Sequence, residues 1–221
     1  MNDPTRKDRE TLEAGLRALG LETGEAVRDA WLRHLSLLRH WGRSYNLVAP
    51  GDFDQLVSRH LLDSLAIHAR VQDGPLLDVG TGAGFPGLPL AILRPERTTV
   101  LMDSAGKKIR FLRHVIRELG LPAVEAVHGR VESFSPRVQF STIVSRAFST
   151  LGDFAAVTRH LAGPETRLIA MKGQVPAKEL AELPTWVHVD AVERLDVPGL
   201  AAERHQVTLT LDPPPKTENR T

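Results

Sequence analysis

The stretch that most constrains the fold is residues 76–90, which read L-L-D-V-G-T-G-A-G-F-P-G-L-P-L. A short apolar run ends on an aspartate and is followed at once by Gly80, Gly82 and Gly84. This order predicts a buried strand, a tight turn that is poor in side chains, and a helix whose first position suits Pro86. Glycine lets a ligand approach the backbone closely, and a helix N-terminus presents unpaired N–H groups. The stretch therefore predicts a site for a nucleoside-bearing cofactor.

The composition limits the classes of protein that remain. The chain has 221 residues, of which 42% are hydrophobic and 25% charged, enough for one substantial core with a small addition. The formal net charge of +1 means that any basic surface for nucleic acid must be local. The absence of cysteine excludes disulfides, thiolate nucleophiles and cysteine metal sites, and the histidines show no metal-ligand spacing. We therefore expect no bound metal.

No segment of the sequence reads as a targeting or membrane-spanning element. The charged N-terminus lacks the apolar core of a signal peptide, and no apolar run approaches the length of a membrane span. We expect a cytoplasmic protein that has no membrane partner and acts as a monomer.

Residues 1–71 carry the periodicity of helices. Apolar residues recur at helical spacing in the segments 11–19, 27–41 and 53–68. The intervening segment 42–50 is too short and too broken to form an element of its own. The sequence predicts an N-terminal helical cap over 1–71.

From residue 76 the pattern alternates between strand and helix, which predicts a mostly parallel sheet with right-handed crossovers. We expect strands at 76–79, 98–102, 124–128, 140–145 and 167–171, with helices at 105–119 and 153–161. A hairpin-like pair at the sheet edge is expected from 186–195 and 206–211. The predicted fold class is α/β: a doubly wound, mostly parallel, seven-stranded Rossmann-like sheet with helices on both faces over 72–212. A disordered tail is expected over 213–221.

The glycine loop alone does not decide which nucleotide it holds. Residues 82–87 match the dinucleotide fingerprint G-x-G-x-x-G, and Asp103 lies roughly twenty residues further on, where an acid binds ribose hydroxyls. A small NAD-binding oxidoreductase or a nucleotide-sensing module is therefore one alternative. However, only the N-terminal helices remain to form the substrate domain that a dehydrogenase needs. The third predicted strand ends in the polar segment G-R-V-E over 129–132, which includes Val131 and Glu132. This segment favours a single nucleoside lying across three strand ends, as S-adenosylmethionine does. Asp78 either contacts this ligand or orients the loop.

Methyl-transfer chemistry narrows the target further. Pyrimidine carbon normally requires a cysteine nucleophile, which this chain lacks. The fourth predicted strand ends in S-R-A-F around Arg146, without the Asn/Asp-Pro-Pro-aromatic clamp that orients exocyclic amines. The remaining target has an exposed lone pair, such as a purine N7, which needs alignment and no general base. We therefore predict no catalytic acid or base. Arg146 either holds the cofactor or substrate, or satisfies carbonyl groups at the strand end.

Basic residues gather on one predicted helix and around one loop. The helix over 105–119 carries Lys107, Lys108, Arg110, Arg113 and Arg117, with no acid between 107 and 117. This pattern is typical of a solvated outer face, and it also suits a phosphate track. Candidates for the pocket mouth are Arg43, Tyr45, Asn46, Arg59 and His60. Capping, packing and an Arg59–Asp63 pair along a helix are the alternatives for this group.

Segments spread over nearly the whole chain resemble the small-subunit ribosomal RNA methyltransferase G family, also called glucose-inhibited division protein B. They are residues 41–47, 59–64, 76–90, 101–112, 129–132, 144–147 and 171–173. The resemblance implies S-adenosylmethionine as cofactor and methylation of guanine N7 in a 16S ribosomal RNA loop near the decoding site. The partner is then 16S ribosomal RNA or a small ribosomal subunit precursor. It also implies cofactor contacts at Gly80, Phe85, Val131, Glu132 and Arg146, with Asp103 at the ribose.

The combined prediction is a class I methyltransferase with an N-terminal helical cap. The predicted cofactor-binding residues are Gly80, Gly82, Gly84, Phe85, Asp103, Val131, Glu132 and Arg146. The predicted substrate-binding residues are Asn46, Arg59, His60 and Lys172, the last of which ends the fifth strand.

Overall fold

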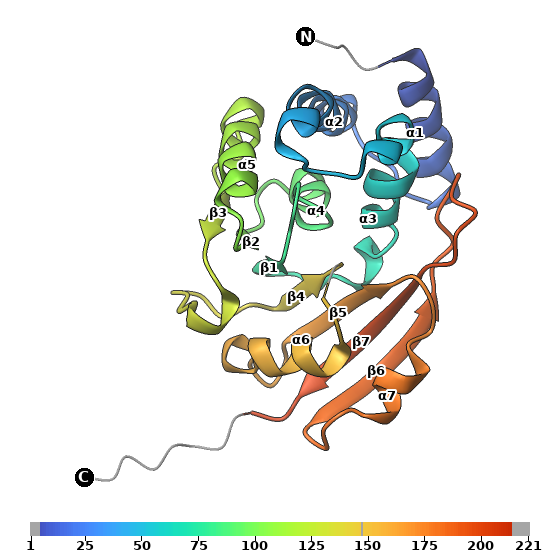
Figure 1. The fold of residues 1–221 in the computed structure, drawn as a ribbon. Helices are drawn as coiled ribbons and strands as arrows, with labels where there is room; N and C mark the ends of the chain where they lie inside the picture. Colours follow the sequence, from blue (N-terminus) through green and yellow to red (C-terminus); the bar gives the residue numbers. More distant parts are fainter. Residues whose placement is uncertain (1–4, 147, 214–221) are drawn as a thin grey trace.

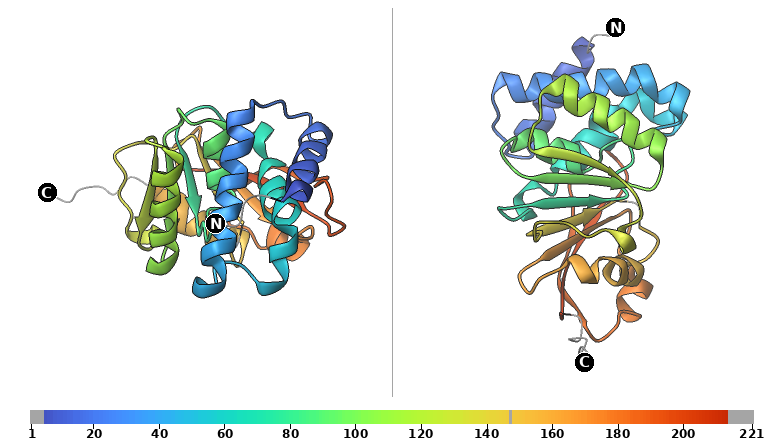
Figure 2. Two further views of the ribbon diagram at one scale, coloured as in Figure 1. Left: turned by 90° about the horizontal axis from the view of Figure 1, so that it is seen from above. Right: turned by 90° about the vertical axis from the view of Figure 1, so that its left-hand side faces the viewer.

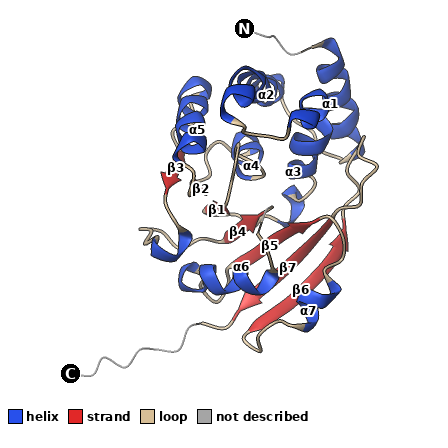
Figure 3. Ribbon diagram, in the orientation of Figure 1, coloured by secondary structure: helices blue, strands red, loops and turns tan. Residues whose placement is uncertain are grey.

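The computed structural model describes residues 5–146 and 148–213. Its centre is a seven-stranded sheet in the order β3-β2-β1-β4-β5-β7-β6, in which only the pairs formed by β7 are antiparallel. Figures 1 and 3 show this sheet crossing the molecule between two groups of helices. The predicted doubly wound, mostly parallel sheet is confirmed. Its strands are β1 Leu76–Val79, β2 Thr99–Asp103, β3 Val124–His128, β4 Thr142–Ser145, β5 Arg167–Lys172, β6 Val187–Arg194 and β7 His205–Leu211.

The two faces of the sheet bury different apolar clusters because side chains alternate along each strand. On β1, Leu77 and Val79 pack toward α6 (Leu151–Thr158) and α7 (Ala177–Ala181), whereas Leu76 packs toward the opposite face. The opposite face is covered by α4 (Gly87–Leu93), α5 (Gly106–Leu119) and the N-terminal cap, as the two views in Figure 2 show. The prediction of helices on both faces is therefore confirmed.

The edge pair forms as predicted, with β7 next to β5 and β6 outermost. Leu168 of β5 pairs with Leu209 of β7, and Val187 at the start of β6 pairs with Leu211. The connection between β6 and β7 reaches back to the N-terminal cap, where Val197 is buried in the same cluster as the cap leucines. The connection between the last two strands thus packs against the N-terminal cap.

The cap begins with α1 (Arg6–Ala18) and α2 (Glu25–Tyr45), both longer than predicted. Helix α1 starts at Arg6 because Thr5 caps it: the Thr5 hydroxyl accepts from the Asp8 N–H, and the Asp8 carboxylate accepts from the Thr5 N–H. Helix α2 continues to Tyr45, so the prediction of a loop from residue 42 is wrong at this end. A Cβ atom at Gly42 would lie 2.8 Å from the Phe53 ring, so a larger residue there would displace that ring.

The prediction of one helix over 53–68 is wrong, because the chain winds through several short helical turns. They are η1 (Pro50–Gln55), the π-helical η2 (Val57–Leu62), α3 (Asp63–Leu65) and η3 (His68–Arg70). A π-helical turn brings residues five apart onto one side. Leu56, which precedes η2, and Leu61 within it are both fully buried. The irregular winding thus keeps two leucines five residues apart in the core.

Smaller differences lie at element ends. Pro86 is the residue before α4, which begins at Gly87, and β4 begins at Thr142 rather than at 140. Helix α6 starts early because the Thr150 hydroxyl accepts from the Asp153 N–H, and it ends in the separate turn η5 (Arg159–Leu161). Helix α7 and the turn η4 (Val131–Ser133) are not predicted. The predicted tail over 213–221 lies outside the described residues, apart from Pro213.

Our proposed division into a cap over 1–71 and a sheet domain over 72–212 follows the change of architecture. The two parts share one apolar cluster, which includes Trp31 and Leu61 of the cap with Leu88 and Leu112 of the sheet domain. In the described part of the chain no helix has the length and apolar character that crossing a bilayer requires.

Candidate cofactor site

The glycine loop after β1 turns sharply back toward β2. The N–H groups of Gly80 and Thr81 both donate to the Met102 carbonyl, at 2.9 and 3.0 Å. Gly80, Gly82 and Gly84 have φ angles of +73°, +62° and +102°, where a residue with a Cβ atom is strained. The predicted side-chain-poor turn is present, and its three glycines are required by its backbone.

Asp78 orients this loop, so the structure favours one of the two interpretations left open for it. Its carboxylate is fully buried and accepts from the Thr81 hydroxyl at 2.6 Å and from the Gly87 N–H at 2.7 Å. Burial raises the pKa of Asp78 to about 6, and these hydrogen bonds oppose that shift. Gly87 cannot be larger, because a Cβ atom there would lie 2.6 Å from the Asp78 side chain.

Asp103 stands at the end of β2 with its carboxylate between the loop and α5. It accepts from the Gly82 N–H at 3.0 Å, the Ala105 N–H at 2.8 Å and the Lys108 ammonium at 3.2 Å. A carboxylate offers about four lone-pair positions, so these three donors leave capacity for a further hydroxyl group. The position and remaining capacity of this carboxylate suit a ribose.

A cavity of about 340 Å³ opens across the carboxyl ends of β1, β2 and β3. This volume falls in the range of small-molecule sites, and ligands of doubly wound sheets bind at this edge. Four predicted cofactor residues meet in it: Gly80, Asp103, Val131 and Glu132. Its other lining residues are Val79, Met102, Ser104, Lys108, Gly129, Arg130 and Phe148.

Lys108 is a cavity residue that the sequence pattern does not single out. The pattern groups it with the outer basic residues of its helix, whereas the structure places it in the cavity, paired with Asp103. Its position in the first turn of the helix that follows the acidic strand end is the signal that places it here.

The remaining predicted cofactor residues lie on the other side of the loop. The Phe85 ring lies 5.0 Å from the ring of His34 and 5.1 Å from that of His60, and the Arg146 guanidinium lies 5.2 Å above it. His34 on α2 lies with Nε2 3.1 Å from the Ala83 carbonyl oxygen. The cap therefore holds the loop directly from this side, and Gly82, Gly84, Phe85 and Arg146 do not line the cavity.

Arg146, directly after β4, is bonded to the cap. Its Nη2 lies 3.0 Å from His60 Nδ1, and its Nη1 lies 3.4 Å from an Asp63 carboxylate oxygen. Because arginine only donates, His60 Nδ1 accepts and His60 Nε2 carries the proton that bonds Asp52 at 3.1 Å. Burial, together with the charge of Arg146, lowers the pKa of His60 to about 4. His60 is thus a neutral bridge between Asp52 and Arg146.

The alternative of an Arg59–Asp63 pair is wrong. Arg59 pairs with Asp52 at 2.9 Å, whereas Asp63 lies within 3.4 Å of Arg146 and 3.2 Å of Arg204. Spacing along the chain suggested a helical pair, but the irregular winding of this segment turns the two side chains to different partners. Asp63 is a junction between the cap, the end of β4 and the β6–β7 connection.

The two other predicted substrate residues have different settings. Asn46 ends α2 in the left-handed conformation, with φ of +50°, and is exposed. The Lys172 ammonium bonds both carboxylate oxygens of Glu179, at 3.1 and 2.9 Å, and only 14% of its side chain is exposed. Asn46 is accessible at the surface, whereas Lys172 is engaged within the protein.

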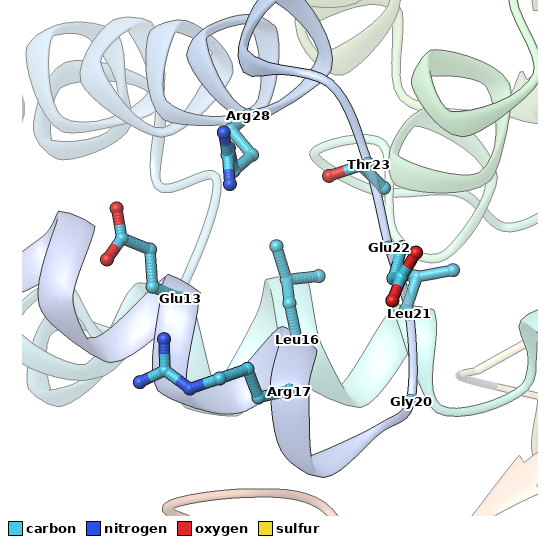
Figure 4. A pocket seen from close by; sticks show the side chains of 8 residues that line it. All are labelled: Glu13, Leu16, Arg17, Gly20, Leu21, Glu22, Thr23 and Arg28. Carbon is cyan, nitrogen blue, oxygen red and sulfur yellow. The ribbon is translucent and has the colours of Figure 1, made fainter.

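A second cavity, of about 600 Å³, lies between α1 and the start of α2 and contains none of the predicted site residues (Figure 4). Its charged lining residues balance, with Glu13 and Glu22 against Arg17 and Arg28.

Across the described ranges, no group of three or more histidine and acidic side chains is arranged to hold a metal ion.

The strand order, the glycine loop after β1, the acid after β2 and the cavity over three strand ends together define a class I S-adenosylmethionine-dependent methyltransferase. Solved structures show the same fold. A SAM-dependent methyltransferase from Aquifex aeolicus has a TM-score of 0.54 at 18% identity and covers 77% of this chain and 98% of its own. TrmN from Thermus thermophilus has a TM-score of 0.55 at 19% identity, covering 67% of this chain and 47% of its own.

The chain belongs to the rRNA small subunit methyltransferase G family, whose family model matches residues 29–208. A relative from Pseudomonas syringae pv. tomato, named ribosomal RNA small subunit methyltransferase G, is 46% identical over 205 residues. That match covers 93% of this chain and 97% of the relative. A relative of the same name from Pseudomonas paraeruginosa is 50% identical over 211 residues, covering 95% of this chain and 98% of the relative. The resemblance seen in the sequence is confirmed.

Proposed function

We propose that this protein transfers a methyl group from S-adenosylmethionine to N7 of a guanine in 16S ribosomal RNA. Family membership supports the RNA of the small ribosomal subunit as the substrate. The observation that carries the proposal is the cavity of about 340 Å³ across β1, β2 and β3, with the Asp103 carboxylate in its wall. We also propose that the protein acts in the cytoplasm and as a monomer.

The residues of the cavity suit a nucleoside cofactor. A Cβ atom on Gly80 would meet nothing within 4 Å, so the backbone at the end of β1 is open to a ligand. Asp103 has capacity for a ribose hydroxyl, and Val131 and Glu132 would face the base from the end of β3. When bound, S-adenosylmethionine supplies an activated methyl group on its sulfonium.

The protein's task is then to align the acceptor rather than to remove a proton. A purine N7 carries its lone pair in the ring plane, and for well-oriented reactants alignment can contribute about 7–11 kcal/mol to such a transfer. Lys108 forms an ion pair with Asp103. His60 is neutral, with a lowered pKa, and bonds both Asp52 and Arg146. We therefore assign no general base to either side chain.

We propose that the exposed Asn46 and Arg59, whose side chain is 38% exposed, contact the RNA at the site mouth. His60 and Lys172 would act indirectly, since His60 bonds Arg146 and Lys172 bonds Glu179. Phe85 and Arg146 would shape the cofactor site from behind the glycine loop.

Two experiments test the proposal. Calorimetry with S-adenosylhomocysteine and with NADH should show binding of the first, and preferential binding of NADH would favour the oxidoreductase alternative instead. Mapping of 7-methylguanosine in 16S ribosomal RNA from cells that lack the protein should show one modification missing. Re-expression of the wild-type protein should restore it. Persistence of every 7-methylguanosine in the deleted strain would refute the proposed activity.

A further inference from the structure

The seam between α2 and α5 combines aromatic rings with cations that have no acidic partner. From this we infer that the seam binds a single-stranded segment of the RNA substrate and guides it to the cavity. The inference rests on the proposed function and adds a second contact surface to it. We call this surface the α2–α5 face, and define it by Trp41, Tyr45, Lys107, Arg110, Arg113, His114 and Arg117.

The aromatic rings of this face form a connected row from both helices. The Trp41 ring on α2 lies 5.5 Å from the Tyr45 ring and 5.2 Å from the His114 ring on α5. All three residues are half-buried, so each is partly accessible at the surface. RNA bases stack on such rings irrespective of sequence, with about 1–3 kcal/mol per base in known single-strand binders.

The cations beside these rings have no acidic partner. Within the described ranges, Lys107, Arg110, Arg113 and Arg117 form no ion pair, and all four are exposed. Their printed side-chain bonds are to neutral groups: the Arg113 Nε–H donates to the Ala126 carbonyl at 3.2 Å, and Arg117 donates to His114 Nδ1 at 3.0 Å.

Some of the other cations of the protein are paired across segments. Arg39 bonds the Asp8 carboxylate, and Arg70 bonds Glu193. At the far end of the seam Glu118 pairs with Arg33 of α2, at 3.5 Å. In a chain of net charge +1, the α2–α5 face is therefore a local excess of positive charge that suits phosphate.

The face leads to the cofactor cavity. Arg33 of α2 meets Glu118 of α5, whereas Trp41 meets His114, so the two helices run antiparallel. The C-terminal end of α2 therefore points toward the N-terminal end of α5, which begins at Gly106 between the cavity residues Asp103 and Lys108. Figure 2 shows α2 and α5 side by side above the sheet.

The same features favour RNA over a membrane surface. The apolar side chains of α5 are turned into the core, where Ile109, Leu112 and Val115 are almost completely buried. The exposed side of the helix thus offers cations and no apolar residues for insertion among lipids. Cations with adjacent aromatic rings are the combination that single-stranded nucleic acid requires.

The electrostatic part is tested with a matched pair of double variants of the full chain. Lys107→Glu with Arg110→Glu alters the face. Residue 107 lies in the first turn of α5, where an acidic side chain is favourable to the helix. Arg17→Glu with Arg28→Glu makes the same change in formal charge at the cavity between α1 and α2 (Figure 4). Binding of transcribed 16S ribosomal RNA is then measured at several salt concentrations.

The face variant should bind RNA about tenfold more weakly, and its salt slope should fall by about 1.5 because two phosphate contacts are lost. The control variant should keep a slope close to that of the wild type. Equal slopes for face and control variants would overturn the inference. Affinity of the face variant for S-adenosylhomocysteine should stay at the wild-type value, so failure of this surface is distinguishable from failure of the cofactor site.

The stacking part is tested by tryptophan fluorescence with single-stranded oligo(A). Binding should quench the wild-type emission, and Trp41→Phe should remove most of this quenching. Trp186→Phe is the control, because Trp186 lies beside Arg159 away from the seam. If Trp41→Phe retains the full quenching, bases do not stack on this face.

Discussion

The two sides of the glycine loop differ in what they leave available. On the cavity side, Gly80 borders open space and Asp103 retains hydrogen-bonding capacity. On the cap side, Phe85 is enclosed by His34, His60 and Arg146. One side is therefore ready for a ligand, and the other is already filled by the protein's own side chains.

The comparison shows how two similar carboxylates acquire different tasks. Asp78 lies one residue before the end of β1, and Asp103 ends the neighbouring strand β2 on the same face of the sheet. Both bond backbone N–H groups of this region. Asp78 is enclosed, with a pKa raised by burial, whereas Asp103 borders the cavity and is paired with Lys108. We expect substitutions on the cap side to change stability, and substitutions on the cavity side to change ligand binding.

The largest effect is expected when Asp78 loses its acceptor oxygen. Asp78→Ala should be about 3 kcal/mol less stable than Asp78→Asn, because alanine leaves the Thr81 hydroxyl and the Gly87 N–H unpaired in the core. Neither variant carries the charge, so the comparison isolates the hydrogen bonds and the cavity. Urea unfolding at neutral pH measures the difference, and equal midpoints would show that the loop does not depend on this residue.

The next effect concerns binding. Asp103→Ala should weaken affinity for S-adenosylhomocysteine by about 2 kcal/mol, or roughly thirtyfold, because a charged acceptor is lost. Its free energy of unfolding should change by less than about 1 kcal/mol, since water can reach the donors that remain. Asp190→Ala, at an exposed carboxylate on β6, is the control. If calorimetry finds that Asp103→Ala binds S-adenosylhomocysteine as tightly as the wild type does, Asp103 does not contact the cofactor.

A pH-dependent effect follows from His34, whose pKa is lowered to about 4 by complete burial. Below its ordinary pKa of 6.5 the unfolded chain takes up the proton first. The stability that the neutral ring contributes is therefore present above pH 6.5 and is lost as the pH falls toward 4. Between about pH 7 and 5.5 the wild type should lose about 1 kcal/mol more than His34→Gln does.

Denaturant unfolding at both pH values measures this difference. Glutamine can still donate to the Ala83 carbonyl but does not titrate. Asp78, whose pKa is raised, responds in the opposite direction, because its contribution is lost as the pH rises from about 4 to 6. It is present in both proteins and cancels in the comparison. Parallel pH profiles for the two proteins would contradict the buried neutral state of His34.

The smallest effect is expected at Arg59, which borders the cap side from the surface. Its ion pair with Asp52 is partly exposed, so Arg59→Ala should change the free energy of unfolding by no more than about 0.5 kcal/mol. Arg146→Ala should cost more, because Arg146 lies over Phe85 and bonds His60. Thermal unfolding of the two variants measures which substitution lowers the stability more. A larger loss for Arg59→Ala than for Arg146→Ala would show that Arg146 does not support the loop.

Local signals made the centre of the fold predictable. The glycines after β1 specify the turn there. The apolar spacing of α5 specifies a helix, which stops at Gly120 with φ of +61°. Both signals depend only on residues close together in the sequence. The turns η1 and η2 were not predictable in the same way. Their winding is decided by which leucines the rest of the cap buries, and that depends on α1, α2 and the β6–β7 connection.

The site was predictable where strand ends determine it. Asp103, Val131 and Glu132 reach one cavity because parallel strands end at the same edge of a sheet. The side of the loop on which Phe85 and Arg146 lie was not predictable, because family resemblance assigns a position in the chain and not a direction in space. The ion-pair partner of Asp63 also depends on distant segments, since Arg146 and Arg204 come from other parts of the chain.

The Asp63 junction has a consequence for the order in which the parts of the protein fold during synthesis. Asp63 is synthesised early, yet both guanidinium groups that neutralise it belong to later segments, and one lies just before the last strand. A buried carboxylate without its cations is costly, so we expect the N-terminal cap to pack around Asp63 only after the final hairpin emerges. Ribosome-bound chains stalled before Arg204 should therefore remain sensitive to protease between α2 and β1, and chains stalled well past β7 should resist it.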